Sequence, residues 1–382
     1  VELIFLNVCP ELLLLYCKHH HLINVRFRAD PIRYSFDWVD CLTYIIPGAK
    51  FSGKFGWYFL CTIVDYRFSL YLIESNLPMW KQKDTDRMLV EIAIAATILF
   101  AFLATTMKQC SIRINFLFII IVSSSFYLHS LRLGVNLSNL PALFYKRIFD
   151  GTDQRYYLLL FYLICVFATL IFCIIVNHLS HSSTVHRKFF HLTVSLICIT
   201  GIQYDFEFIW LSAWLTLCIF VIIEVFRSKC VSPWSKYLND WLLIFIDKQD
   251  SPKLILTPIY LMAGIFLPLF LSPIANNEYR HLYHFAGVAT IGVGDSLAAI
   301  IGSKYGRLYW PKSQKTMEGS VAFAIGQFIF CILICLYYLK CDINMYQLLW
   351  IMLSSFTCAF FEAILPAMDN IILPVIAYLI LS

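Results

Sequence analysis

Three clusters of charged side chains interrupt an otherwise apolar sequence, and each stands at an edge of an apolar run or inside one. The first cluster spans 185–191, where Arg187, Lys188 and His191 lead into an apolar segment. Two cations followed by a histidine could clamp a phosphate group. A basic anchor at a membrane surface has the same composition. The residues alone leave both interpretations open.

The second cluster is an acidic residue among glycines, Gly292-Val293-Gly294-Asp295-Ser296, inside the apolar run 282–302. A carboxylate at bilayer depth is costly unless it faces a cavity, a cation or a partner. Small residues at this position also suit close helix packing, which explains the glycines but not the acid. We therefore favour a functional role for Asp295.

The third cluster is the loop 302–320, which is basic and bounded by glycine residues. Its cations could neutralise phosphates, and backbone N–H groups at a glycine-containing helix start can bind anions. A short basic loop is also common on the cytosolic side of membrane proteins. An acid followed by such a loop is nevertheless what a metal-bound nucleoside triphosphate requires. The cations of the loop are Lys304, Arg307, Lys312 and Lys315.

The composition indicates which elements must position these clusters. The chain has 382 residues, of which 60% are hydrophobic and 14% charged, with a mean hydropathy of +0.73. These values exclude soluble, disordered and nucleic-acid-binding classes. They predict an all-α, polytopic integral membrane bundle of about ten to twelve transmembrane helices. The expected spans are 88–107, 114–133, 156–176, 207–226, 255–271, 282–302 and 319–339, with weaker candidates at 3–17, 55–73, 189–202, 346–361 and 371–381.

The distribution of positive charge predicts the orientation of the spans. One set of alternate loops carries 19 of the 29 Lys and Arg residues, and the other set carries nine. The richer set is expected to be cytosolic, and it includes all three charged clusters. No Walker A, HExxH or CxxC pattern occurs in the chain, so neither a P-loop ATPase nor a zinc site of these types is supported.

Over 185–382 the sequence resembles the dolichol kinase family of CTP-dependent polyprenol kinases. The resemblance rests on the segments 186–202, 245–269, 292–320 and 361–375. The third is the most specific, because a Gly-Asp element is followed there by Trp-Pro and Lys-Thr-x-Glu-Gly. The resemblance implies two regions: 1–184, transmembrane and without a recognised motif, and 185–382, which is catalytic and contains the CTP-binding loop 302–320.

The resemblance also implies the residues of the site. Asp295 and Gly294 match the Gly-Asp element, Arg187, Lys188 and His191 match an Arg-Lys-x-x-His element, and Glu362, Asp369 and Asn370 match the final acidic element. Gln314 departs from the family, which often has lysine there. The segment implied to bind CTP comprises Tyr309, Trp310, Pro311, Lys312, Ser313, Gln314, Lys315, Thr316, Met317, Glu318, Gly319 and Ser320.

The implied reaction converts CTP and dolichol into dolichyl phosphate and CDP, which supplies a lipid carrier for protein glycosylation. Asp295 is expected to bind a divalent cation, Mg²⁺, and Asp369 could be a second ligand or only a helix cap. Lys304, Lys312 and Lys315 would neutralise the triphosphate, and Arg187 or Lys188 would meet the γ-phosphate. The base that accepts the alcohol proton could be His191, Glu362 or Asp369. The resemblance implies a multi-pass protein of the endoplasmic reticulum membrane, with its site facing the cytosol.

Two kinds of alternative stay open at this point. Another CTP-using lipid enzyme would phosphorylate phytol, farnesol or diacylglycerol, or would be a phosphatidate cytidylyltransferase that releases pyrophosphate. An ion-coupled transporter would instead use Asp295 to bind the translocated ion. The basic loop directly after Asp295 favours an enzyme at the membrane interface. The acceptor chain length and the oligomeric state do not follow from the sequence.

Overall fold

The computed structural model describes residues 84–149, 153–178, 184–242, 254–272, 280–311, 313–365 and 368–382. All of them lie in the larger of the two units into which the chain divides, Gly53–Ser382. The predicted spans 3–17 and 55–73 and the predicted ligand Lys312 lie outside the described residues. The prediction of a boundary between 184 and 185 stays a prediction.

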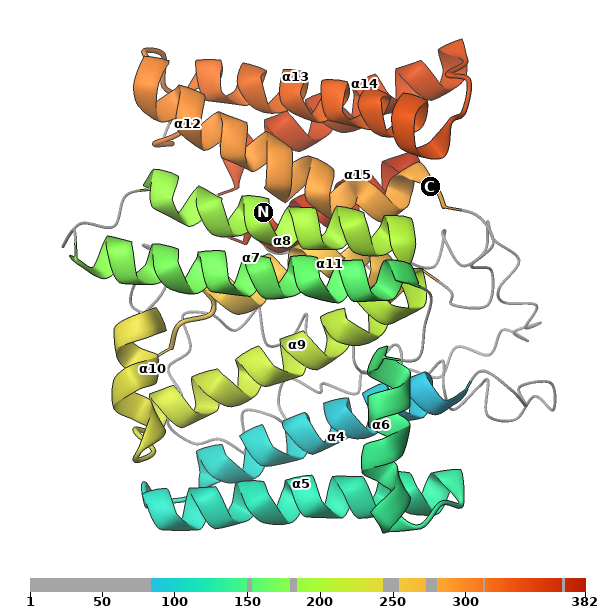
Figure 1. The fold of residues 1–382 in the computed structure, drawn as a ribbon. Coiled ribbons are helices and arrows are strands. Elements are labelled where there is room, and N and C mark those ends of the chain that lie inside the picture. The colour runs from blue at the N-terminus through green and yellow to red at the C-terminus, as the bar shows by residue number, and fades with distance from the viewer. Residues whose placement is uncertain are drawn as a thin grey trace, which may run out of the picture. The chain divides into compact units, whose positions relative to one another are not determined.

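Every regular element among the described residues is a helix (Figure 1). An isolated antiparallel bridge joins Tyr309 to Thr316. Helices satisfy all their backbone hydrogen bonds within one segment, which suits continuous apolar runs. In chain order the elements are α4 (Asp84–Thr106), α5 (Ser111–Leu133), η1 (Leu137–Asn139), α6 (Leu140–Phe149), α7 (Asp153–His178), α8 (Thr184–Tyr204), α9 (Phe206–Ser228), α10 (Trp234–Leu242), α11 (Thr257–Leu271), η4 (Leu282–Phe285), η5 (Val288–Asp295), α12 (Ser296–Tyr305), α13 (Met317–Leu333), η6 (Ile334–Leu339), α14 (Met345–Ile364) and α15 (Asp369–Leu381).

The outer surface of these helices is apolar, as a membrane protein requires. On α7, for example, Leu163, Phe167 and Ile171 are all more than half exposed. Such a surface is rare on soluble monomers but suits lipid. The prediction of an all-α polytopic membrane bundle is confirmed. Within the described residues six segments are long and apolar enough to cross a bilayer: Thr85–Thr106, Ser111–Leu133, Arg155–Val176, Phe206–Ser228, Met317–Leu339 and Met345–Ile364.

Most of the remaining predicted spans correspond to helices that are shorter or interrupted. The segment 189–202 lies within α8, which has 21 residues. The segment 255–271 contains α11, and 371–381 lies within α15, and these two helices have only 15 and 13 residues. About 20 residues are needed to cross the hydrocarbon core. The segment 282–302 is divided into η4, η5 and α12. The short and interrupted helices are therefore α11, α15 and the 282–302 segment, and all three contribute to the pocket described below.

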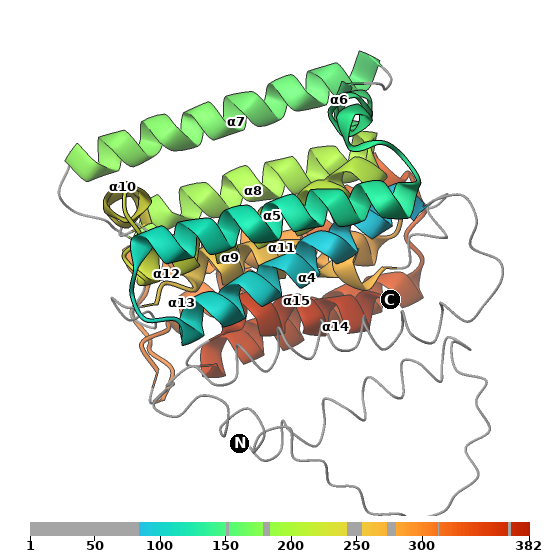
Figure 2. The ribbon, with the colours of Figure 1, turned by 90° about the horizontal axis from the view of Figure 1, so that it is seen from below.

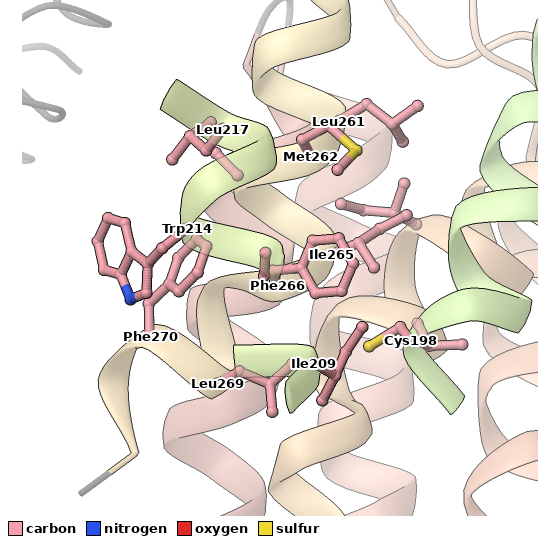
Figure 3. Close-up of a cluster of buried hydrophobic side chains, with 14 of the residues drawn as sticks. Cys198, Ile209, Trp214, Leu217, Leu261, Met262, Ile265, Phe266, Leu269 and Phe270 are labelled. Carbon is pink, nitrogen blue, oxygen red and sulfur yellow. The ribbon is translucent and has the colours of Figure 1, made fainter. Parts of the chain in front are cut away.

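The core is formed where α8, α9 and α11 pack together (Figure 3). Trp214 of α9 stacks on Phe270 of α11, with ring centroids 4.0 Å apart. Ile265 and Leu269 of α11 and Cys198 of α8 are fully buried around them. Since lipid is as apolar as these side chains, close packing rather than exclusion from water holds such helices together. This core fixes α8 and α11 next to each other.

The chain order places the charged clusters at one end of the bundle. The helices α8, α11, α13 and α15 begin there, and α12 and α14 end there, at the left in Figure 1. Figure 2 shows the same helices from below, with α7 lying outside α8. Neighbouring helix ends of this kind can bring residues far apart in sequence into one site.

Candidate active site

A pocket of about 400 Å³ lies at this end of the bundle and contains charges of both signs. Its basic side chains come from α8 and from the loop before α13. Its acidic side chains come from the end of η5, the last turn of α14 and the start of α15. The charged and titratable residues that line it are Arg187, Lys188, His191, Asp295, Lys315, Glu362 and Asp369.

Asp295 is the centre of one charge cluster in this pocket. Its carboxylate pairs with the Lys188 ammonium, and its Oδ2 lies 3.3 Å from Nδ1 of His191. The same Nδ1 lies 3.4 Å from the Ile291 carbonyl oxygen. Because both neighbours of Nδ1 are acceptors, the neutral imidazole carries its proton on Nδ1 and keeps Nε2 as an acceptor. Lys188 and His191 share a face of α8 because they are three residues apart.

A π-helical segment, η5, delivers Asp295 to the pocket. An extra residue in a helical turn rotates the side chains that follow it, and such turns are frequent at functional sites. Two glycines let neighbouring helices approach this segment. A Cβ on Gly292 would lie 2.1 Å from Ser195 Oγ, and one on Gly294 would lie 2.8 Å from the Phe323 ring. The packing explanation therefore accounts for these glycines but not for the carboxylate.

Lys315 is the centre of the second charge cluster. Its Nζ lies 2.9 Å from Glu362 Oε1 and 3.0 Å from Asp369 Oδ2, and it donates to the Glu362 carbonyl oxygen at 2.7 Å. Burial alone would lower the pKa of the Lys315 ammonium, but the two carboxylates outweigh it and hold that pKa above its ordinary value. Lys315 therefore stays charged throughout the neutral range.

The loop before α13 aims Lys315 by a short hairpin-like turn. The Trp310 N–H donates to the Lys315 carbonyl oxygen at 3.0 Å, and the Met317 N–H donates to the Leu308 carbonyl oxygen at 2.8 Å. Thr316 is the N-cap of α13, and its Oγ1 accepts from the Gly319 N–H at 3.2 Å. The backbone of Lys315 and the side chain of Thr316 are therefore both held in this turn, and the Lys315 side chain is directed toward the carboxylates.

Several predicted ligands in this region have structural contacts instead. The Glu318 carboxylate accepts from the backbone N–H groups of Arg307 and Leu308, at 3.0 and 3.2 Å. The Trp310 indole donates to Ser320 Oγ at 3.0 Å. These contacts close the loop on itself. Of the predicted nucleotide-binding residues, Tyr309, Gln314, Thr316 and Gly319 line the pocket, while Gly294, Lys304, Trp310, Pro311, Ser313, Met317, Glu318 and Ser320 do not.

Sequence reasoning missed the wall that α11 contributes. Thr257, Pro258 and Leu261 line the pocket together with Phe190 of α8. Proline is favoured in the first turn of a helix, so Thr257-Pro258 was a readable signal for a helix that starts at this end of the bundle. Nothing in those residue types indicated that the start of α11 would face Asp295. The pocket thus has an apolar side as well as a charged one.

The acidic residues of the pocket each pair with a lysine and do not form a closed set of metal ligands. In the described part of the chain, no three His, Cys, Asp or Glu side chains gather closely enough to hold a metal ion by themselves. Nucleotide-bound Mg²⁺ usually takes only one or two carboxylates and completes its shell with phosphates and water. Asp295 and Asp369 both line the pocket, and their carboxylate oxygens are of the kind that Mg²⁺ prefers.

Comparison with known proteins shows which curated proteins the chain resembles. No protein-family model and no solved structure matches the chain. It is 34% identical to human dolichol kinase over 257 residues, which are 63% of this chain and 47% of the human protein. It is 35% identical to the Saccharomyces cerevisiae dolichol kinase over 162 residues, 42% of this chain and 29% of the yeast protein. The curated proteins that the chain resembles are thus dolichol kinases from animals and yeast.

A plant member of the family extends the range of the similarity. The chain is 29% identical to the Arabidopsis thaliana dolichol kinase EVAN over 227 residues, 57% of this chain and 40% of that protein. The chain spans about half the length of the mammalian dolichol kinases it matches, and 40% of the plant protein.

Proposed function

We propose that this protein is a dolichol kinase, which transfers the γ-phosphoryl group of CTP to the hydroxyl group of dolichol in the endoplasmic reticulum membrane, with its pocket facing the cytosol. The observation that carries the proposal is a pocket with both acids and cations at the helix ends of an apolar bundle, in a chain that is similar to curated dolichol kinases. A water-soluble donor and a bilayer-bound acceptor can meet only at such an interface.

The cations of the pocket supply the donor side. Arg187 and Lys188 begin α8 on one side of the pocket, and Lys315 faces them from the loop before α13. Phosphoryl transfer depends mainly on positioning and on stabilising charge, and cations within reach of the phosphates provide both. Tyr309 lines the same pocket and is exposed, so its ring is placed to stack on the base of the nucleotide.

The acids of the pocket are proposed to meet Mg²⁺ through Asp295 and Asp369. A bound Mg²⁺ would neutralise charge on the β- and γ-phosphates as the transferred group leaves. Both carboxylates now hold an ammonium group, Asp295 that of Lys188 and Asp369 that of Lys315. Binding of the donor therefore requires an exchange of partners, in which each lysine turns from its carboxylate to a phosphate oxygen. Lys can make this exchange because its ammonium group is a compact charge on a flexible stem.

The acceptor is proposed to enter along the apolar side of the pocket. Phe190, Pro258 and Leu261 provide a surface for an isoprenoid chain next to the charged groups. His191 is the best-placed base, because Asp295 and the Ile291 carbonyl hold its Nδ1 and leave Nε2 to accept the alcohol proton. Glu362 and Asp369 are less suited to this role, since both already accept from Lys315.

The reaction forms one bond and breaks one. The dolichol oxygen forms a bond to the γ-phosphorus, and the bond between that phosphorus and the oxygen bridging to the β-phosphorus breaks. The electron pair of the broken bond stays on CDP. The proton of the hydroxyl group moves to Nε2 of His191 and from there to water.

A matrix of donors and acceptors tests the proposal. The protein is purified in detergent and incubated with CTP, ATP, GTP or UTP and with dolichol, phytol, farnesol or diacylglycerol. We expect CTP with dolichol to give dolichyl phosphate and CDP well above every other pair. Release of pyrophosphate instead of CDP, or a preference for another alcohol or nucleotide, would contradict the proposal.

A further inference from the structure

A buried ion pair lies at the end of α9, outside the pocket. Glu224 and Arg227 are each only 4% exposed. Arg227 donates from Nε to Glu224 Oε2 at 2.8 Å and from Nη2 to Oε1 at 2.6 Å. A buried pair of this kind contributes little net stability, because desolvation offsets the attraction between the charges. Its presence in an apolar bundle therefore calls for another explanation.

Glu224 has a second contact that points to such an explanation. Its Oε1 accepts from the backbone N–H of Ile255 at 2.7 Å. Ile255 precedes the first residue of α11, Thr257, by two positions. On the other side of the pair, Arg227 Nη1 donates to Asn239 Oδ1 of α10 at 3.3 Å. The pair thus ties the start of α11 to the end of α9.

The start of α11 is also a wall of the pocket. Thr257, Pro258 and Leu261 line it. One turn further on, Gly264 packs so closely on α15 that an added Cβ would lie 1.7 Å from the Asn370 carbonyl oxygen. Asn370 directly follows Asp369, which holds Lys315. A displacement of α11 would therefore change the apolar wall and disturb the second charge cluster.

We propose that Glu224 is a positioning residue for this pocket: its carboxylate holds the Ile255 N–H and so sets where the Thr257–Leu261 turn stands. Arg227 neutralises the carboxylate so that it can be buried. The inference that Glu224 affects substrate binding rests on the proposed dolichol kinase activity. The inference that Glu224 sets the position of α11 does not depend on that activity.

Two matched double variants separate the hydrogen bond from the charge. Glu224→Gln/Arg227→Met removes both charges but keeps an oxygen that can accept from Ile255. Glu224→Met/Arg227→Met removes the charges and the acceptor. Neither variant leaves a buried charge without its partner, so both avoid the main cause of misfolding in single variants. Arg155→Met/Asp205→Asn, which removes a different ion pair at the other end of the bundle, is the control.

Thiol labelling reports the position of α11 and does not depend on enzymatic activity. Thr257→Cys is introduced into wild type and into each double variant, and its rate of reaction with a charged thiol reagent is compared, with the parent chain as background. We expect the Met/Met variant to change this rate by about tenfold, as for loss of one buried hydrogen bond. The Gln/Met variant and the control should match wild type. Equal rates in the Met/Met and Gln/Met variants would overturn the proposal.

Kinetics give a second readout. A displaced wall should raise the KM for dolichol in the Met/Met variant by about tenfold while kcat stays close to wild type. A purely structural role would instead reduce the folded fraction, lower the apparent kcat and leave KM unchanged, which would also overturn the proposal. If the wild-type protein makes no dolichyl phosphate, the proposed function fails, and the labelling result still decides the role of Glu224.

Discussion

The far end of the helical bundle and the pocket both hold partly buried ion pairs, but the two sets are paired in different ways. At the end away from the pocket, each of two carboxylates meets an arginine. Arg155 Nε lies 2.8 Å from Asp205 Oδ2, and Arg147 Nε lies 2.7 Å from Asp86 Oδ2. Asp205 is also the N-cap of α9. These pairs join helix ends and loops with a fixed geometry.

Inside the pocket, the cations that pair with carboxylates are lysines and the partners are shared. Lys315 lies between the carboxylates of Glu362 and Asp369, while Asp295 is shared by Lys188 and His191. The planar arginine fork matches a carboxylate in two places, whereas an ammonium group is a single charge that reorients easily. The comparison teaches that the arginine pairs of the far end suit a fixed geometry and the lysine pairs of the pocket suit an exchange of partners.

The strongest test of this difference is a carboxylate replacement at each end. Asp295→Asn should reduce dolichol phosphorylation by about a hundredfold or more, because it removes the charge that faces Lys188, the donor and His191. Asp205→Asn should leave activity near wild type, since asparagine also caps helices well. Activity is measured as dolichyl phosphate formed per folded protein. Similar losses in both variants would contradict the distinction.

Lys315 provides the next largest effect. Lys315→Met should raise the Kd for CTP by about ten- to a hundredfold, the range expected for loss of a hydrogen bond to a charged group. It also leaves Glu362 and Asp369 without the cation that lies between them. Lys315→Arg keeps the charge and should recover part of the affinity. Titration with CTP in a binding assay measures both, and unchanged affinity in the Met variant would remove Lys315 from the site.

The far end predicts a change in stability without a change in chemistry. Arg155→Lys removes the two-point contact with Asp205 and should therefore lower the free energy of unfolding. The apparent unfolding temperature should fall by about 2–4 °C for each kcal/mol that is lost. Its kcat and KM should stay at wild-type values, because Arg155 lies at the opposite end of the bundle from the pocket. A thermal unfolding scan and an activity assay on the same preparation make the measurement. A loss of activity at unchanged stability would be the contrary result.

The smallest expected effect concerns Gln314, which lines the pocket. Gln314→Lys adds a cation near the donor and should tighten CTP binding by about two- to fivefold, as a partly exposed charge pair contributes about 1 kcal/mol or less. The gain should shrink at high salt. Binding isotherms at low and high ionic strength would measure it, and weaker binding in the variant would show that this position faces away from the phosphates.

The sequence predicted the fold class and the residues of the charged pocket for a physical reason. Charges are expensive in an apolar bundle, so Lys188, Asp295 and Lys315 stand out, whereas Glu362 was implied by the family resemblance. All four line one pocket in the structure. Their catalytic and ligand roles stay predictions. The α11 wall could not be predicted, because Thr257, Pro258 and Leu261 are ordinary residues for a helix start.

Other features depend on contacts that a single segment does not encode. The π-helical turn before Asp295 forms against α8 and α13, with close approaches at Gly292 and Gly294. Glu318 has the residue type of a ligand, yet its carboxylate accepts from the backbone of its own loop. The direction of a loop side chain is set by such local hydrogen bonds. The presence of a charge therefore did not show that Lys315 lines the pocket while Glu318 does not.

The most direct test of the central proposal follows the phosphoryl group itself. Purified protein is incubated with dolichol and with CTP that carries radioactive phosphorus at either the γ or the α position. We predict that label from the γ position appears in dolichyl phosphate, that label from the α position stays in CDP, and that Asp295→Asn reduces the transfer by about a hundredfold or more. Label from the α position in the lipid, or full transfer by the Asp295→Asn variant, would contradict the proposal.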